Sequence, residues 1–365
     1  MTVFSAAILL ITSCKKESDD DTPPVNWPSD SIRTVKTGLN FPWEILWGSD
    51  DHIWMTERGG KISKIDPLTG NTVFSTSIAD VAAKGEGGLL GMVQHPDFKN
   101  NGYLYVAYNY NSGSTYLEKI VRLQFKDNAL SAPLVLLENI PASNIHNGAR
   151  LWITSGGEPK LFVTTGDANN QPSAQDINSL SGKVLRINLD GSIPADNPIA
   201  GNPYWSSGHR NAQGLVVANN IVYATEHGPN VEDELNIIEK AGNYGWPSVT
   251  GLCNGGEASF CATNNVRSPL WSSGGSTVAT SGLDYYNKDL IAPWKNSLLM
   301  TTLKDATLYQ FKLNADGRSI ASTTEYFNGR WGRLRDLCIS PQGRVYLCTS
   351  NGSNQDVLVE ISNPD

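Results

Sequence analysis

The sequence has little positive charge and no long hydrophobic stretch. Its 365 residues include 28 Lys and Arg against 36 Asp and Glu, which gives a formal net charge of −8. Because no basic stripe offers contacts to phosphates, this balance argues against binding to nucleic acid. The mostly apolar run at residues 3–12 is too short to span a bilayer as a helix.

Histidine and cysteine are also scarce, which limits the metal and redox chemistry that the sequence supports. The five histidines show no H-x-x-x-H or H-x-H pairing, so zinc is not expected, and no C-x-x-C-H motif for haem occurs. Cys253 and Cys261 close a short Gly- and Asn-rich loop and are expected to form a disulfide. Cys338 and Cys348 flank a turn between two predicted strands, where they either pair or simply pack.

The N-terminal segment has the pattern of an export signal. Residues 1–13 contain the apolar run and end directly before Cys14, as in the lipobox of bacterial lipoproteins, where the cysteine is acylated. Residues 14–30 are charged, rich in Pro and aperiodic, which is typical of a flexible tether. We therefore expect an exported protein, lipid-anchored to a bacterial membrane through Cys14 and facing the periplasm or the cell surface. A general secretion signal in which the cysteine occurs by chance is the alternative.

Glycine, tryptophan and short β-rich runs are abundant instead. The chain has 34 Gly and 10 Trp, and no segment shows a sustained helical period. One pattern recurs, in which a β-rich run, a Gly/Asn/Asp turn and a second run ending in Thr, Tyr or Ser are followed by a third run. The repeated units occupy residues 42–66, 89–110, 150–167, 211–228, 281–317 and 334–350.

Equivalent apolar positions in these units lie 47 to 68 residues apart. They are Ile45, Met92, Leu151, Leu215, Leu283 and Leu337. Repeats of this size with about four short strands each predict an all-β fold, a six-bladed β-propeller of four-stranded antiparallel sheets. The propeller would form a single domain over residues 31–365, in which residues 31–39 supply the outer strand that closes the ring. A two-sheet sandwich is the competing architecture, although its repeats would be shorter.

Polar residues gather where the predicted strands begin or end. Glu86 lies between glycines before the second unit, His146 precedes the third unit, and Asp167 follows a strand of that unit. In a propeller such loop ends meet at one mouth of the central channel, where a pocket is expected. Four cations also occupy loop ends, namely Arg210, Lys304, Arg333 and Arg335. Because guanidinium groups bind carboxylates in bidentate fashion, this cluster favours an organic anion over a neutral sugar.

Each of these residues also has an ordinary structural explanation when it is taken alone. An aspartate after a strand, such as Asp167, commonly forms a turn, and a lysine such as Lys304 is common in hairpins. Taken together, the residues of the cluster indicate a catalytic site, because a histidine beside it suits proton abstraction near neutral pH. Backbone carbonyls at Gly228 and Pro229, with carboxylates nearby, suit calcium, which takes oxygen ligands.

Several longer motifs carry a family resemblance. In chain order they are "GEGGLLGMVQHPDFKNNGYLYVAY", "HNGARL", "TTGD", "LSGKVLRINLDG", "GHRNAQGL", "EHGPNVEDELNIIEKAGNYGWP" and "RLRD". Together they resemble the soluble PQQ-dependent aldose sugar dehydrogenases, also called the glucose/sorbosone dehydrogenase family. The resemblance implies a six-bladed propeller that holds pyrroloquinoline quinone (PQQ) and Ca²⁺ at the channel mouth. It also implies oxidation of an aldose sugar at the anomeric carbon to the lactone, by hydride transfer to PQQ, with an unknown electron acceptor.

The resemblance further implies roles for individual residues. His146 would be the general base that takes the proton of the anomeric hydroxyl, and Asp167 the acid that orients it. Contacts to PQQ or the reacting groups would come from Glu86, Gln171, Arg210, Asn211, Lys304, Arg333 and Arg335. The carbonyls of Gly228 and Pro229 would hold the calcium that is linked to PQQ. Glu234 and Tyr244 would be ligands of a second, structural calcium.

Glu86 departs from the family pattern, because the best-known members have glutamine near the reactive quinone carbonyl. A carboxylate there requires protonation or a cationic partner, for which Arg210 is a candidate.

Two other functions stay open. One is a non-catalytic carbohydrate-binding or interaction propeller with a structural calcium, and the other is a calcium-dependent hydrolase of the lactonase type. The basic loop residues favour an anionic cofactor over a hydrolase, which typically gathers carboxylates and asparagines around its metal.

Overall fold

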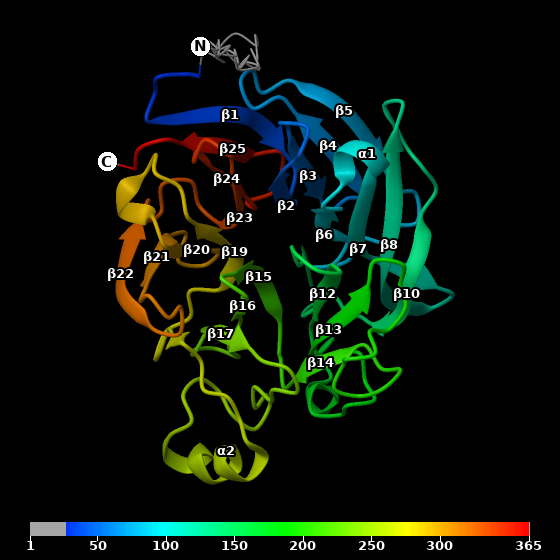
Figure 1. The fold of residues 1–365 in the computed structure, drawn as a ribbon, viewed down its shortest axis with the longest axis vertical. Coiled ribbons are helices and arrows are strands. Elements are labelled where there is room, and N and C mark those ends of the chain that lie inside the picture. Colours follow the sequence, from blue (N-terminus) through cyan, green and yellow to red (C-terminus); the bar gives the residue numbers. More distant parts are fainter. Residues whose placement is uncertain (1–26, 365) are drawn as a thin grey trace, which may run out of the picture.

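Six antiparallel β-sheets surround a central axis in the computed structural model of the protein, which describes residues 27–364 (Figure 1). This arrangement confirms the six-bladed β-propeller that was predicted from the repeats. The predicted signal peptide, Cys14 and the tether up to residue 26 lie outside the described residues. Within residues 27–364, no helix has the length and apolar character needed to cross a membrane.

The first three blades each begin with an inner strand and proceed outward. Blade one consists of β2 (Pro42–Trp47), β3 (Ile53–Glu57), β4 (Lys61–Ile65) and β5 (Thr72–Ser77). Blade two consists of β6 (Leu89–Gln94), β7 (Tyr103–Ser112), β8 (Thr115–Lys126) and β10 (Leu134–Pro141), with the short β9 (Ala129–Leu130) paired to β8. Blade three consists of β11 (Gly148–Ile153), β12 (Lys160–Thr165), β13 (Lys183–Asn188) and β14 (Tyr204–Ser207).

The remaining blades follow the same order, except that the last takes its outer strand from the start of the chain. Blade four consists of β15 (Ala212–Ala218), β16 (Ile221–Glu226), β17 (Glu234–Ile238) and β18 (Trp271–Ser272). Blade five consists of β19 (Thr280–Tyr286), β20 (Ser297–Thr302), β21 (Leu308–Leu313) and β22 (Ile320–Tyr326). Blade six consists of β23 (Leu334–Ile339), β24 (Val345–Thr349), β25 (Asp356–Ile361) and β1 (Ile32–Leu39).

Short helices occur only in the connections of the described chain. They are α1 (Phe98–Asn101), α2 (Ala258–Asn264) and the 3₁₀ turns η1 (Gln171–Ala174), η2 (Gly255–Glu257) and η3 (Ala292–Trp294). The segment with α2 projects from blade four at the bottom of Figure 1. It carries the expected disulfide between Cys253 and Cys261. Cys338 and Cys348, whose pairing the sequence left open, are free and buried on β23 and β24.

Both ends of the chain build blade six. β1 pairs with β25 in antiparallel register, with Ile32 opposite Ile361 and Thr34 opposite Val359. The inner strands contact one another in an unbroken ring that runs β2, β6, β11, β15, β19, β23 and back to β2. The prediction that residues 31–39 supply the closing strand is confirmed by this pairing.

The six equivalent apolar positions of the repeats line one central channel. Ile45, Met92, Leu151, Leu215, Leu283 and Leu337 all contribute to its cavity of about 190 Å³. Each inner strand also shows a register shift close to its first residues, as between Gly148 and Leu151 of β11. An irregularity of this kind bends a strand and redirects the residues next to it, which lie at the channel mouth.

The hydrophobic core lies between the blades. Among the described residues, each of the six interfaces between neighbouring blades has its own buried cluster. Between blades one and two, for example, Trp54 packs edge-on against Phe98 with ring centroids 5.7 Å apart. Because both faces of each sheet are covered, a middle strand such as β12 is buried at every position. This double burial explains the continuous apolar runs of the sequence.

Candidate functional site

Strand connectivity brings the polar residues of the loop ends together. In an antiparallel hairpin, the start of one strand lies beside the end of the next. Glu86 precedes the inner strand β6, and His146 precedes the inner strand β11. Both therefore lie at the same end of the propeller as the residues that follow the second strand of a blade. Asp167, which follows β12, is one of the latter.

His146 and Asp167 form a hydrogen-bonded pair. The Nδ1 atom of His146 lies 2.8 Å from Oδ1 of Asp167. Because an ionised carboxylate only accepts hydrogen bonds, this contact places the imidazole proton on Nδ1 and the free lone pair on Nε2. The His146 side chain is 13% exposed, whereas that of Asp167 is fully buried. The pair can therefore accept a proton from a molecule in the adjoining pocket while its carboxylate stays shielded from water.

Two further donors fix the Asp167 carboxylate. The indole Nε1 of Trp246 donates to Oδ2 over 2.8 Å, and the backbone N–H of Asn169 donates to Oδ1 over 2.8 Å. Trp246 lies in the "NYGWP" part of the long motif, 79 residues along the chain from Asp167. No role was predicted for this tryptophan from the sequence, because nothing in the local pattern indicates its partner.

The loops that hold Glu86 and His146 are shaped by close backbone approaches. Gly85 has a φ of +59°, and a Cβ atom there would lie 2.1 Å from the carbonyl oxygen of Asn144. The next N–H, that of Glu86, donates to the same carbonyl over 2.7 Å. His146 itself has a φ of 56°, a strained value for a residue with a side chain. Its backbone N–H lies 3.3 Å from a carboxylate oxygen of Glu86, so the two loops are directly joined.

A cavity of about 320 Å³ lies next to Glu86 and is lined mainly by basic and polar side chains; His146 and Asp167 do not line it themselves but contact it through Glu86. The lining residues are Phe41, Arg58, Glu86, Gln213, His227, Ala279, Leu303, Lys304, Arg333, Arg335 and Ser350. Burial, together with the charges of Arg333 and Arg58, lowers the pKa of Arg335 to about 9. Positive charge is therefore in excess here, and an anion in the cavity would relieve it.

Several buried donors around the cavity lack a partner. Among the described residues, no hydrogen bond satisfies Nε of Arg58, Arg210 and Arg335 or Nε2 of His227. Buried polar groups are normally hydrogen-bonded, so donors gathered in this way indicate that the pocket binds a polar or anionic molecule. Arg58 was not among the residues predicted from the sequence, because it lies in blade one, whose motif shows no distinctive pattern.

Arg210 and Asn211 lie behind the cavity, between blades three and four. The Arg210 guanidinium packs over the Trp246 ring, 5.3 Å from its centroid, and one nitrogen lies 3.5 Å from the His227 carbonyl oxygen. Asn211 is 1% exposed, and its side-chain oxygen accepts the N–H of Gly148. Gln171, which was also predicted to line the site, is exposed at the start of η1 and does not line the cavity.

Glu86 is surrounded by positive charge but makes no ion pair with Arg210 among the contacts of residues 27–364. Its charge opposes the lowering of the pKa that burial imposes on Arg58 and Arg210. The charge of Glu86 also opposes the lowering of the pKa of Arg335, so the carboxylate is compensated by three arginines at a distance and not by one direct partner. This arrangement replaces the single Arg210 partner that the sequence suggested.

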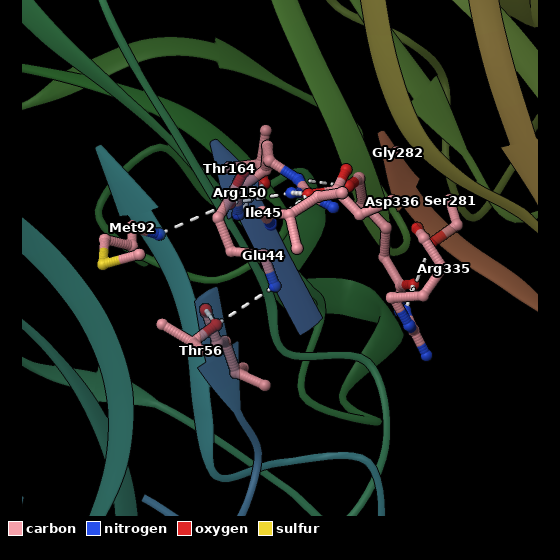
Figure 2. Close-up of polar contacts among 12 residues, drawn as sticks. Glu44, Ile45, Thr56, Met92, Arg150, Thr164, Ser281, Gly282, Arg335 and Asp336 are labelled. Carbon is pink, nitrogen blue, oxygen red and sulfur yellow. Dashed lines mark hydrogen bonds and ion pairs between the residues drawn. The ribbon is translucent and has the colours of Figure 1, made fainter. Parts of the chain in front are cut away.

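The floor of the cavity rests on a buried ionic network in the channel. Arg150 lies between Glu44 and Asp336, at nitrogen–oxygen distances of 2.7 Å and 3.0 Å (Figure 2). Its Nε donates to the backbone carbonyl of Gln213, whose side-chain oxygen in turn accepts a hydrogen bond from Arg335. The network therefore connects the channel to a cation of the cavity.

The four residues predicted to bind calcium surround a second, very small cavity of about 10 Å³. Gly228, Pro229, Glu234 and Tyr244 all line it, together with Glu226 and Glu232. In the described chain, the carbonyl oxygens of Gly228 and Pro229 accept no backbone hydrogen bond. The carbonyls and carboxylates supply oxygen ligands, which fit Ca²⁺ better than Zn²⁺. Arg210 and His227 also line this cavity.

The acidic side chains of this corner are held by protein donors. Glu234 accepts hydrogen bonds from the N–H of Gly251 and the side chain of Asn236, each at 2.8 Å. Burial, with the nearby charge of Glu226, raises the pKa of Glu234 to about 8. The hydroxyl of Tyr244 donates to the Ile237 carbonyl over 2.5 Å, so only its backbone carbonyl is available to a cation. No group of three or more Asp, Glu, His or Cys side chains in residues 27–364 is arranged to hold a metal.

Known proteins resemble this chain along nearly its whole length. A family model described as glucose/sorbosone dehydrogenase matches residues 39–359. Quinoprotein glucose dehydrogenase B of Acinetobacter calcoaceticus is 32% identical, with 88% of this chain and 86% of the relative covered. Aldose sugar dehydrogenase YliI of Escherichia coli strain K12 is 30% identical, with 91% and 92% covered.

Solved structures show the same fold. The PQQ-bound aldose sugar dehydrogenase of Streptomyces coelicolor superposes with a TM-score of 0.77 at 31% sequence identity, over 92% of this chain and 99% of that chain. The apo form of the soluble aldose sugar dehydrogenase of Escherichia coli gives a TM-score of 0.80 at 27% identity, over 92% and 99%. The site residues described above thus lie within the matched part of the chain.

Proposed function

Because the chain belongs to the glucose/sorbosone dehydrogenase family and is therefore an oxidoreductase, we propose that it oxidises an aldose at the anomeric carbon to the lactone, with PQQ as the hydride acceptor. One observation carries this proposal. It is the pairing of His146 with the buried Asp167 next to Glu86, which lines a cavity together with Arg58, Arg333 and Arg335. A proton acceptor and an anion-binding wall are thus adjacent.

The basic wall suits a cofactor with several carboxylates. Arg333, Arg335, Arg58 and Lys304 come from three different blades and converge on one cavity. The unpaired Nε atoms of Arg58 and Arg335 can donate to carboxylates, and guanidinium groups can do so with bidentate geometry. When bound, PQQ supplies an acceptor for the two electrons that leave the sugar as a hydride. The protein supplies binding, orientation and electrostatic stabilisation.

His146 takes the proton of the anomeric hydroxyl in this proposal. Its Nε2 carries the lone pair, because Nδ1–H is engaged by Asp167. Asp167 then stabilises the imidazolium, and the hydrogen bonds from Trp246 and Asn169 keep the carboxylate from turning away. Arg210, anchored over Trp246, stabilises negative charge that develops on the sugar oxygen.

We also propose calcium at the corner formed by Gly228 and Pro229. Their free carbonyl oxygens would hold the ion, which would offset the negative charge of the cofactor beside His227. Glu234 and the backbone carbonyl of Tyr244 would serve a structural ion in the same corner. Magnesium is less suited to such sites, because it demands near-octahedral geometry and keeps its waters.

Export and lipid anchoring at Cys14 stay part of the proposal. The disulfide between Cys253 and Cys261 supports export, because disulfides persist mainly in oxidising compartments such as the periplasm. The substrate is a small sugar, and the electrons pass to an acceptor outside the chain.

The first prediction concerns reconstitution and the general base. Purified protein that is given PQQ and Ca²⁺ should reduce a dye with aldoses as the electron source. The variant His146→Asn should bind PQQ with unchanged affinity, followed by its absorbance, while kcat falls by about 100-fold or more. Asparagine keeps a side chain of similar size that can bond Asp167 but cannot accept the proton.

His95→Asn is the matched control, because His95 lies in the turn after β6 and lines neither cavity. It should leave kcat unchanged. Addition of EGTA should abolish the activity, and Ca²⁺ should restore it better than Mg²⁺. Full activity of His146→Asn would contradict the assignment of His146 as the general base. A wild-type protein that binds no PQQ would contradict the proposed function itself.

A further inference from the structure

Lys183 is a lysine whose ammonium group is enclosed by protein. It is the first residue of β13, and it is 0% exposed. Its Nζ contacts backbone carbonyl oxygens where a buried lysine would usually meet a carboxylate. The distances are 2.8 Å to Ser173, 3.0 Å to Ala174 and 2.7 Å to Ser181. The three hydrogens of the ammonium thus have three acceptors.

These carbonyls belong to both ends of one loop. Ser173 and Ala174 form the last turn of η1, which follows Asp167, whereas Ser181 lies just before β13. The ammonium therefore ties η1 to the end of the loop of residues 167–182, in addition to the backbone hydrogen bond of 2.7 Å from Gly182 N–H to the Gly166 carbonyl. All three carbonyl dipoles point at the same position, so only a cation or a strong donor can be accommodated there.

The closed loop also supports the residues around the proposed base. The Ala174 carbonyl accepts the N–H of Gly208, two residues before Arg210. The neighbouring side chain of Gln175 donates to the Trp246 carbonyl over 2.7 Å. Trp246 in turn donates to the Asp167 carboxylate over 2.8 Å. A continuous set of hydrogen bonds thus leads from the loop that Lys183 closes to the partner of His146.

We propose that Lys183 is a positioning residue, whose ammonium holds the loop of residues 167–182 closed and thereby keeps Asp167 against His146. The inference rests on the proposed function, because it concerns the support of the proposed base. The lysine touches neither cavity, so its effect passes through the loop. Other contacts join the ends of the loop, from the Gly182 N–H to the Gly166 carbonyl and from the Thr165 hydroxyl to the Leu180 carbonyl. None of them links the carbonyls of Ser173 and Ser181, which accept no other hydrogen bond apart from a turn contact at Ser173.

The test removes the ammonium and then supplies it again. In Lys183→Ala, the missing atoms correspond to n-propylammonium, which can enter the vacated space and meet the three carbonyls. Hydrogen–deuterium exchange of the apo protein should show amides in residues 167–182 exchanging about tenfold faster in the variant. Addition of n-propylammonium should slow them towards the wild-type rate, whereas the neutral analogue 1-propanol should not.

Two variants serve as controls. Lys160 begins the neighbouring strand β12 and pairs with the exposed Glu158 at 2.6 Å, so Lys160→Ala should leave exchange in residues 167–182 unchanged. Lys183→Met keeps the aliphatic stem without the charge, and it should loosen the loop without responding to n-propylammonium. If Lys183→Ala fails to fold, hydrogen–deuterium exchange is measured on Lys183→Met instead. Wild-type exchange rates in the Lys183 variants would overturn the proposal.

The activity measurement separates this inference from the proposed function. With PQQ and Ca²⁺ present, Lys183→Ala should lose about 100-fold in kcat while PQQ affinity changes little, because most of the basic wall comes from other blades. The propylammonium rescue should appear in kcat as well. If the wild-type protein is inactive, the proposed function fails, and the exchange experiment still decides whether Lys183 closes the loop.

Discussion

At the scale of single residues, the channel contains a carboxyl group whose protonation is linked to folding. Asp284 of β19 lines the central cavity and accepts the N–H of Tyr285 over 2.7 Å. Burial, with the charge of Asp336 as a second cause, raises the pKa of Asp284 to about 7. In the unfolded chain the pKa of an aspartate is about 4. The folded protein therefore binds more protons than the unfolded chain between these values, and stability is lost as the pH rises from about 4 to about 7.

Asp284→Asn should remove this loss. The amide oxygen can still accept the N–H of Tyr285, so the variant should be more stable than the wild type by about 1–3 kcal/mol at pH 7. The difference should be nearly lost at pH 4, where the carboxyl is protonated in the folded state and about half protonated in the unfolded chain. Urea unfolding at several pH values measures it. The control is Asp289→Asn, because Asp289 is exposed in the same blade, and this variant should not gain stability at pH 7. If Asp284→Asn were still more stable than the wild type by the full amount at pH 4, the cause would be packing and not protonation.

At the scale of elements, strand β1 is an integral part of the last blade although it begins the described chain. Its final residue, Leu39, is 2% exposed and packs in the cluster between blades six and one. Leu39→Ala should lower the free energy of unfolding by about 2–4 kcal/mol, because it leaves a cavity in this interface. Leu134→Ala on β10, where the side chain is 51% exposed, should change it by less than about 0.5 kcal/mol. Equal effects in denaturant unfolding would mean that β1 contributes little to the ring.

The sequence was most informative about elements that repeat. Alternating runs and turns located the inner strands, and the six apolar markers at Ile45 and its equivalents share one channel because each occupies the same place in its blade. The same patterns predicted the positions of His146 and Asp167. They could not predict Trp246 or Lys183 as partners of that site, because those contacts join residues that no local period relates. Arg58 was missed for the same reason, and the short α2 has no periodicity to detect.

At the scale of the whole molecule, the proposed anchor determines where the oxidation takes place. Cys14→Ser should release the protein from the membrane fraction into the soluble fraction of the exported proteins, without changing its sugar oxidation. Fractionation of expressing cells, combined with labelled fatty acid, measures both the position and the acylation. A wild-type chain that takes up no label and sediments like the serine variant would exclude the lipid anchor but not export.

The pairing of β1 with β25 also sets an order of events during synthesis. Ile32 pairs with Ile361 of β25, so β1 leaves the ribosome more than 300 residues before the strand with which it pairs and forms its sheet late. Blade six also carries Arg333 and Arg335, two of the four cations in the wall of the cavity. An unfinished chain thus lacks half of that wall until its two ends have joined. On the proposed function, the cofactor should therefore bind only after the ring has closed.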